Sequence, residues 1–156
     1  MVAEPSAFML DSNVFSRVLD GLLPFPSKAD RRFLVTGVQA DECQRASCPE
    51  RRAGLLRALE EIAPELCPAA SFCADIEGAG FDQAEINDGT GRFEAMLARL
   101  KVLDPKPPKK DLNQIRDIVI AETALKLGAT LVTDDVKLRQ VLEEYGGVAV
   151  PSSALA

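Results

Sequence analysis

The chain has 156 residues, of which 47% are hydrophobic and 27% are charged, and its formal net charge is −6. These are the proportions of an ordinary globular protein, and we expect a single domain spanning residues 1–156. No apolar run approaches the roughly 18 residues of a membrane span, and the N-terminal segment lacks the pattern of a secretory signal, so a cytoplasmic protein is expected.

The residue types that are missing narrow the chemistry. The chain has no histidine, so no imidazole can act as a base or a metal ligand. Its four cysteines contain no C-x-x-C pair, which argues against a zinc site and favours buried, reduced thiols. They are Cys43, Cys48, Cys67 and Cys73. The negative net charge is unusual for a nucleic-acid binder, but four acidic residues discussed below account for −4 of it. The remaining charge neither supports nor excludes a polyanionic substrate.

Short apolar runs alternate with amphipathic segments along the chain. In the first half we expect a strand over 7–10, a helix from Ser12 or Asn13 to about Asp20, a loop over 22–30, a strand over 33–35, a helix from Thr36 to Ala46, a helix from Pro49 that ends before Pro64, and a strand over 69–73. In the second half we expect a loop over 78–91, a helix over 92–102, a turn over 104–110, a helix over 112–127 with Gly128 at its C′ position, a strand over 129–133, a helix over 134–145 and a strand over 148–150.

This alternation predicts an α/β fold, with three α/β/α layers around a central parallel sheet of about five strands. Ligands of such folds bind at the carboxyl ends of the strands. Asp11 follows the apolar run AFML, and Asp135 closes the segment ATLVTDD, so both are expected at that edge. The alternative for Asp11 and Asp135 is helix capping. Ser12 and Asn13 could cap in place of Asp11, however.

Two further acids lie within helices. Asp117 belongs to a nearly apolar helix and faces small alanines, so we expect it to be at least partly buried. A buried carboxylate needs a cation, and the alternatives to a metal are Arg116 and Arg139. Glu42 shares a helix face with apolar residues, although an exposed glutamate is the simpler interpretation. One site for a hard cation, Mg²⁺ or Mn²⁺, explains all four acids together and favours hydrolysis of a phosphate ester or phosphodiester.

Several blocks of the sequence now resemble the PIN-domain nucleases, including the VapC-type toxins of toxin–antitoxin pairs. They are LDSNVF (10–15), VQADE (38–42), RDIVIAETALKLGATLVTDD (116–135) and the last helix and strand through Val150. The resemblance covers essentially the whole chain, although residues 49–108 match in layout only. It implies that Asp11, Glu42, Asp117 and Asp135 are the catalytic and metal-binding residues, with Asn13, Thr133 and Asp134 in supporting positions.

The resemblance further implies an endoribonuclease that uses Mg²⁺ or Mn²⁺ and leaves 5′-phosphate and 3′-hydroxyl ends. An RNA substrate, an antitoxin protein and a second copy of the chain are the candidate partners. RNA contact is expected from basic residues: Lys28, Arg31, Arg32, Arg45, Arg51, Arg52, Lys106, Lys109 and Lys110.

Two alternatives remain open beside this interpretation. The first is a PIN fold that binds RNA or protein with little catalysis. The second is a phosphatase similar to the haloacid dehalogenases. It is disfavoured because Asn13 stands where that family requires a second aspartate.

Overall fold

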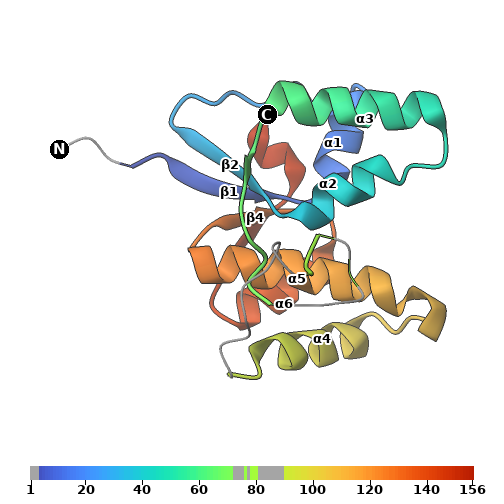
Figure 1. Ribbon diagram of the computed structural model, residues 1–156. Helices are drawn as coiled ribbons and strands as arrows, with labels where there is room; N and C mark the ends of the chain where they lie inside the picture. The colour runs from blue at the N-terminus through green and yellow to red at the C-terminus, as the bar shows by residue number, and fades with distance from the viewer. Residues whose placement is uncertain (1–3, 72–75, 77, 81–89) are drawn as a thin grey trace.

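A five-stranded sheet forms the centre of the computed structural model, which describes residues 4–71, 76, 78–80 and 90–156. All neighbouring strands are parallel, in the order β3-β2-β1-β4-β5. The strands are β1 (Ser6–Leu10), β2 (Arg31–Val35), β3 (Glu65–Leu66), β4 (Thr130–Val132) and β5 (Val148–Val150). Helices lie on both sides of the sheet (Figure 1). The expected three-layer fold with a parallel sheet is therefore confirmed.

Each of the six expected helices is present, with ends within two residues of the prediction. They are α1 (Ser12–Leu19), α2 (Gly37–Gln44), α3 (Pro49–Ile62), α4 (Arg92–Leu103), α5 (Asp111–Leu127) and α6 (Val136–Glu144), with short 3₁₀ helices η1 (Pro108–Lys110) and η2 (Ser152–Leu155). Gly128 ends α5 in the left-handed conformation, at φ 66°, as its position predicted. In the parts of the chain described above, no helix is both long and apolar enough to cross a membrane.

The third strand is the main error of the prediction. It was expected over 69–73, whereas β3 comprises Glu65 and Leu66 and pairs with the end of β2. The reason is that α3 ends at Ala63 in a left-handed conformation, which turns the chain at once onto the sheet edge. Ala70 instead donates its backbone N–H to the Thr123 hydroxyl of α5, at 2.9 Å. Residues 72 and 73, like most of the loop expected over 78–91, lie outside the described residues.

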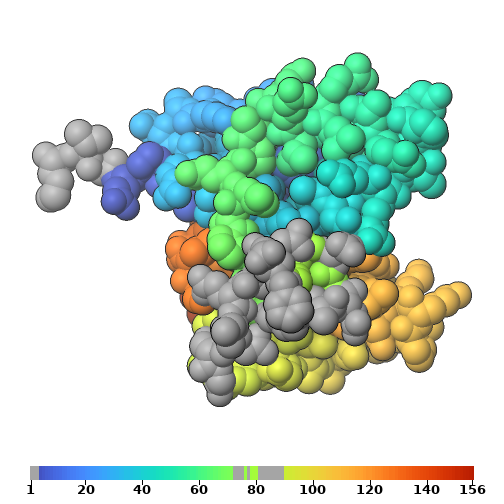
Figure 2. All heavy atoms as spheres, viewed as in Figure 1, coloured from blue at the N-terminus to red at the C-terminus, as the bar shows by residue number. Residues whose placement is uncertain are grey.

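Two hydrophobic cores hold the layers together, one on each face of the sheet. On one face, α1, α3 and η2 pack around Phe15, Leu55 and Leu155. On the other face, α4, α5 and α6 pack around Met96, Ile118 and Leu138. The two groups form the upper and lower halves of the molecule in Figures 1 and 2. Helix α2 contributes to both cores and therefore lies where the two halves meet.

The cysteines fit the predicted pattern only in part. Cys43 is buried, and burial raises the pKa of its thiol to about 11. Cys67 is half-buried, and its thiol donates to the Val35 carbonyl at 3.3 Å. Cys48, by contrast, is exposed just before α3, so the expectation of a buried thiol is wrong there. Cys73 lies outside the described residues.

Candidate functional site

The four acids singled out from the sequence come from four different elements. Asp11 joins β1 to α1, Glu42 belongs to α2, Asp117 to α5, and Asp135 precedes α6. The Asp11 backbone N–H donates to the Val132 carbonyl at 3.0 Å, which fixes the carboxyl ends of β1 and β4 side by side. The charge of Asp135 raises the pKa values of Asp11 and Asp117, and the charge of Asp11 raises those of Glu42 and Asp117, so the four side chains form one acidic cluster at this edge.

Asp11 lies at the centre of a hydrogen-bond network and is only 6% exposed. One carboxylate oxygen accepts from the Ser12 backbone N–H at 2.7 Å, and the other accepts from the Thr133 hydroxyl at 2.6 Å and from the Asn13 amide at 3.4 Å. Asp11 is thus the N-cap of α1, and the expectation that Ser12 or Asn13 caps instead is wrong. Burial raises the pKa of Asp11 and the charge of Asp135 acts in the same direction, whereas the bonds from Thr133 and Ser12 lower it.

Asp117 has acids rather than a cation as its main charged neighbours. Burial raises its pKa well above the ordinary value, and the charges of Asp11, Glu42 and Asp135 add to the effect. The two arginines proposed as its partners point elsewhere. Arg139 donates to the Thr133 carbonyl at 2.7 Å, and Arg116 lies 3.5 Å from the Asn113 side-chain oxygen.

Glu42 is half-buried, so the alternative of an exposed glutamate is wrong. Burial raises the pKa of its carboxyl, a hydrogen bond from the Ser12 hydroxyl lowers it, and the charge of Asp11 raises it. Arg116 lowers the same pKa through its positive charge. Ser12 therefore links Glu42 to Asp11, a role that sequence reasoning missed because it treated Ser12 as a helix cap. The only signal was its position next to Asp11.

Asp135 caps the next helix in the same way that Asp11 caps α1. Its carboxylate accepts from the backbone N–H groups of Lys137 and Leu138, both at 3.0 Å. Its own backbone N–H donates to the Thr133 hydroxyl at 3.2 Å. Thr133 thus contacts both strand-end acids, in keeping with the supporting position that the resemblance assigns to it.

Asp134 is directed away from the acidic cluster, in contrast to its neighbour. Its carboxylate pairs with Arg17 of α1 and accepts from the Ser152 backbone N–H at 2.9 Å and from the Ser152 hydroxyl at 2.8 Å. Although burial acts to raise it, the pKa of Asp134 lies below its ordinary value because Ser152 and Arg17 stabilise the charged form. These contacts of Asp134 join α1 to η2, and they do not involve the acids that it was expected to support.

The donor set fits a hard cation by chemical type. Carboxylates are the ligands that Mg²⁺ prefers, and the buried side-chain oxygen of Asn13 beside Asp11 has no hydrogen-bond partner. Among the described residues, however, no three Asp, Glu or Cys side chains lie in an arrangement that could hold a metal ion as they stand. Mg²⁺ is usually bound through one or two carboxylates and several waters, so a complete protein ligand shell is not required.

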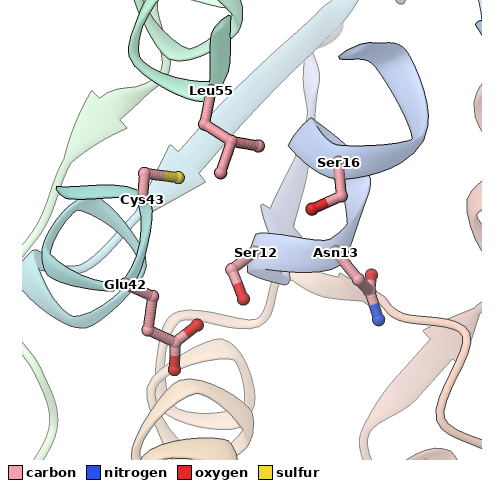
Figure 3. A pocket seen from close by; sticks show the side chains of 6 residues that line it. All are labelled: Ser12, Asn13, Ser16, Glu42, Cys43 and Leu55. Atoms are coloured by element: carbon pink, nitrogen blue, oxygen red, sulfur yellow. The ribbon is translucent and has the colours of Figure 1, made fainter. Parts of the chain in front are cut away.

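A small open pocket adjoins the cluster. Its volume is about 180 Å³, and it is lined by Ser12, Asn13 and Ser16 of α1, Glu42 and Cys43 of α2, and Leu55 of α3 (Figure 3). Ser12 and Glu42 belong both to the pocket and to the acidic network. The sequence did not indicate this pocket, because Ser16 and Leu55 lie in helices where only Asn13 and basic residues of α3 had been assigned a function.

Most of the basic residues considered for RNA contact already have partners within the protein. The six earliest in the chain contact backbone carbonyls or acidic side chains: Lys28 with Ala63, Arg31 with Leu155, Arg32 with Glu65, Arg45 with Asp41, Arg51 with Asp20 and Arg52 with Ala46. Lys106 and Lys137 instead both contact Asp104, each at 3.3 Å. Asp104 is close enough to raise the pKa of Asp117, so these lysines lie at the rim of the cluster.

The comparisons with known proteins concern the fold. The chain matches no protein-family model and no curated protein. The solved structures to which it is similar include VapBC-5 of Mycobacterium tuberculosis, a member of the VapBC family of toxin–antitoxin systems (23% identity, 94% of this chain and 98% of that chain, TM-score 0.46), VapBC2 of Rickettsia felis bound to a promoter DNA fragment (12%, 93% and 98%, 0.44), and FitAcB of Neisseria gonorrhoeae (15%, 95% and 99%, 0.47).

At such identities and TM-scores the similarity adds no argument about activity.

Proposed function

We propose that this chain is a PIN-type endoribonuclease that hydrolyses RNA phosphodiester bonds at the acidic cluster with Mg²⁺ or Mn²⁺. The observation that carries the proposal is the electrostatics of the cluster. Three acids have raised pKa values because they are wholly or partly removed from solvent and face other acids. Such an arrangement destabilises a folded protein, and strongly perturbed acids that converge from separate elements are characteristic of functional sites.

The contacts of the individual residues support the following roles. Asp11, Asp117 and Asp135 would hold the metal, with Glu42 as a further ligand. A bound divalent cation lowers the pKa of a water ligand and offsets charge on the phosphate. Thr133 and Asn13 hold the Asp11 carboxylate in one orientation through their hydrogen bonds. Such supporting contacts keep ligands in the geometry that the reaction needs.

The RNA backbone would contact the protein at the rim of the cluster, beside Asp104. Lys106 and Lys137 each lie 3.3 Å from that carboxylate, and their ammonium groups can bind phosphates on either side of the cleaved bond. Lys137 was not among the residues selected from the sequence. A positive rim also compensates for the repulsion between an acidic cluster and an RNA backbone.

The proposed biological role is that of the toxin of a toxin–antitoxin pair, with an antitoxin protein and a second copy of the chain as candidate partners. The support for this role is the set of sequence blocks shared with VapC-type toxins. Co-purification of the chain with the product of a small adjacent reading frame would test it. Light scattering of the purified chain would test the dimer.

The test of the activity is cleavage of a structured RNA mixture with Mg²⁺, with Mn²⁺ and with EDTA. Asp11→Asn is the informative variant because asparagine still caps a helix, so the fold is retained while the charge is lost. Asp30→Asn is the matched control, since Asp30 is an exposed acid with a positive φ that asparagine tolerates. We expect metal-dependent cleavage by the wild type and by Asp30→Asn but none by Asp11→Asn. Cleavage that survives in EDTA or in Asp11→Asn would refute the proposal.

A second candidate is a PIN-fold module that binds RNA or protein with little catalysis. It is favoured by the finding that, within the described residues, no three acidic or cysteine side chains are already arranged around a metal position. This candidate predicts RNA binding without cleavage under any metal condition, and a melting temperature that Mg²⁺ and Mn²⁺ leave unchanged.

A further inference from the structure

The pocket beside the acidic cluster has two chemically different walls. On one side, Ser12 and Ser16 lie one turn apart on α1, which places them on the same helix face. On the other side, Cys43 and Leu55 present apolar atoms. Figure 3 shows the Ser16 hydroxyl directed into the space opposite Leu55, and the Ser12 hydroxyl on the side of Glu42. The pocket therefore suits a group with both hydroxyls and an apolar face.

The charge of the pocket limits what it can bind. Of the described residues that line it, none is a lysine or an arginine, and Glu42 contributes a carboxylate. A phosphate would therefore be repelled, whereas hydroxyl or amino groups could donate to Glu42. The volume, about 180 Å³, lies below the roughly 300 Å³ at which pockets for drug-sized ligands begin. It is suited to a single sugar or ring.

We propose that this pocket binds the ribose of a nucleotide adjacent to the cleaved phosphate and selects RNA over DNA through the 2′-hydroxyl. Serine hydroxyls both donate and accept hydrogen bonds, as the 2′-hydroxyl does, and this hydroxyl is the group by which proteins distinguish RNA from DNA. Leu55 and Cys43 pack against the apolar face of the sugar. The inference rests on the proposed nuclease function, because it places the ribose next to Glu42 and Ser12 of the acidic network.

The first experiment combines a protein variant with a change in the substrate. Ser16→Ala removes one hydroxyl without touching the acidic network, and Ser153→Ala, at an exposed position in η2, is the matched control. The substrates are an RNA that the wild type cleaves and two versions of it, one with a 2′-deoxy nucleotide on the 5′ side of the cleaved bond and one with it on the 3′ side. We expect one deoxy position to lower kcat/KM of the wild type and of Ser153→Ala by about five- to tenfold, the effect of one hydrogen bond. In Ser16→Ala the same deoxy substitution should have no further effect.

An equal deoxy effect in wild type and Ser16→Ala would overturn the inference and leave the nuclease proposal intact. If the wild type cleaves no RNA, nuclear magnetic resonance decides. Adenosine and uridine are titrated against their 2′-deoxy counterparts, without metal, into the wild type and Ser16→Ala. The inference then requires shifts at Ser16 and Leu55 that are larger for the ribonucleosides and lost in Ser16→Ala. Equal shifts for the two sugars, or none, would overturn it.

Discussion

Two of the three acids in helix α5, Asp117 and Glu122, lie in opposite electrostatic environments. Glu122 is 2% exposed, accepts a hydrogen bond from Ser71 and pairs with Arg92 at 3.3 Å. Asp117, one and a half turns earlier, has Asp11, Glu42 and Asp135 as its charged neighbours. Folding alone explains an acid that has a cationic partner, but it does not explain a group of acids that repel one another. The comparison therefore separates the structural carboxylate of this helix from the functional one.

The largest expected effect is on cleavage. Asp117→Asn should lower kcat/KM by more than about 100-fold, since even side chains that only orient metal ligands contribute 10- to 100-fold. Glu122→Gln, on the same helix, should leave kcat/KM of the folded protein within about threefold of the wild type, because Glu122 contacts Ser71 and Arg92 rather than the cluster. Single-turnover kinetics at saturating Mg²⁺ would compare them. Equal losses in the two variants would remove the distinction between these acids.

The second effect is on stability, where we expect a substitution at Glu122 to cost more than one at Asp117. Glu122→Ala removes the acceptor of the Ser71 hydroxyl and the partner of Arg92 in a buried setting. We expect the free energy of unfolding to fall by about 2–3 kcal/mol, as is usual when one member of a buried polar pair is lost. Urea denaturation at pH 7 measures this change. A loss below about 0.5 kcal/mol would show that the pair does not hold α4 and residue 71 to α5.

A smaller loss is expected at Asp134, which extends the comparison to two adjacent residues. Asp134→Ala breaks the pair with Arg17 and the hydrogen bonds from Ser152, near the protein surface. Stability should fall by about 1–2 kcal/mol while cleavage by the folded protein is retained. Asp135→Asn should instead abolish cleavage and leave stability unchanged, because asparagine keeps the cap of α6 but loses the charge. A loss of activity without a loss of stability in Asp134→Ala would place Asp134 in the site.

The contrast between Asp134 and Asp135 also shows which features a single sequence could not predict. Local chemistry was sufficient for helix boundaries, because Pro49 and Gly128 act within one turn of their own positions. The roles of two adjacent acids depend on partners far away in the chain, such as Arg17, and a single sequence does not show those pairings. The exposed two-residue strand β3 has no apolar pattern to detect, since only its backbone defines it.

The candidate site was predictable to a similar degree. Asp11 and Asp135 follow apolar strands, and parallel topology brings such strand ends together, so their proximity could be expected. Glu42 and Asp117 were grouped with them because one cation site would explain every acid on an apolar helix face, although helix positions alone do not say which strand edge they face. The pocket formed by Ser16 and Leu55 depends on how α1 and α3 pack, which no local pattern encodes.

The smallest expected effect is on the pH dependence of stability without metal. The raised pKa values of Asp11, Glu42 and Asp117 mean that the folded chain holds protons that the unfolded chain has released. Stability from these groups is therefore highest near pH 4, the ordinary value for a carboxyl, and falls as the pH rises through the raised pKa values.

In Asp117→Asn this decline should be shallower, so the variant should melt about 2–4 °C above the wild type at pH 7.5. Mg²⁺ should reduce the difference by stabilising the wild-type carboxylates. Melting curves between pH 4.5 and 8, with EDTA and with Mg²⁺, measure both effects, and the difference between the proteins removes the contribution of other titrating groups. A wild type that melts above Asp117→Asn at pH 7.5 in EDTA would mean that Asp117 has a cationic partner after all. It would then belong with Glu122 among the structural acids of α5.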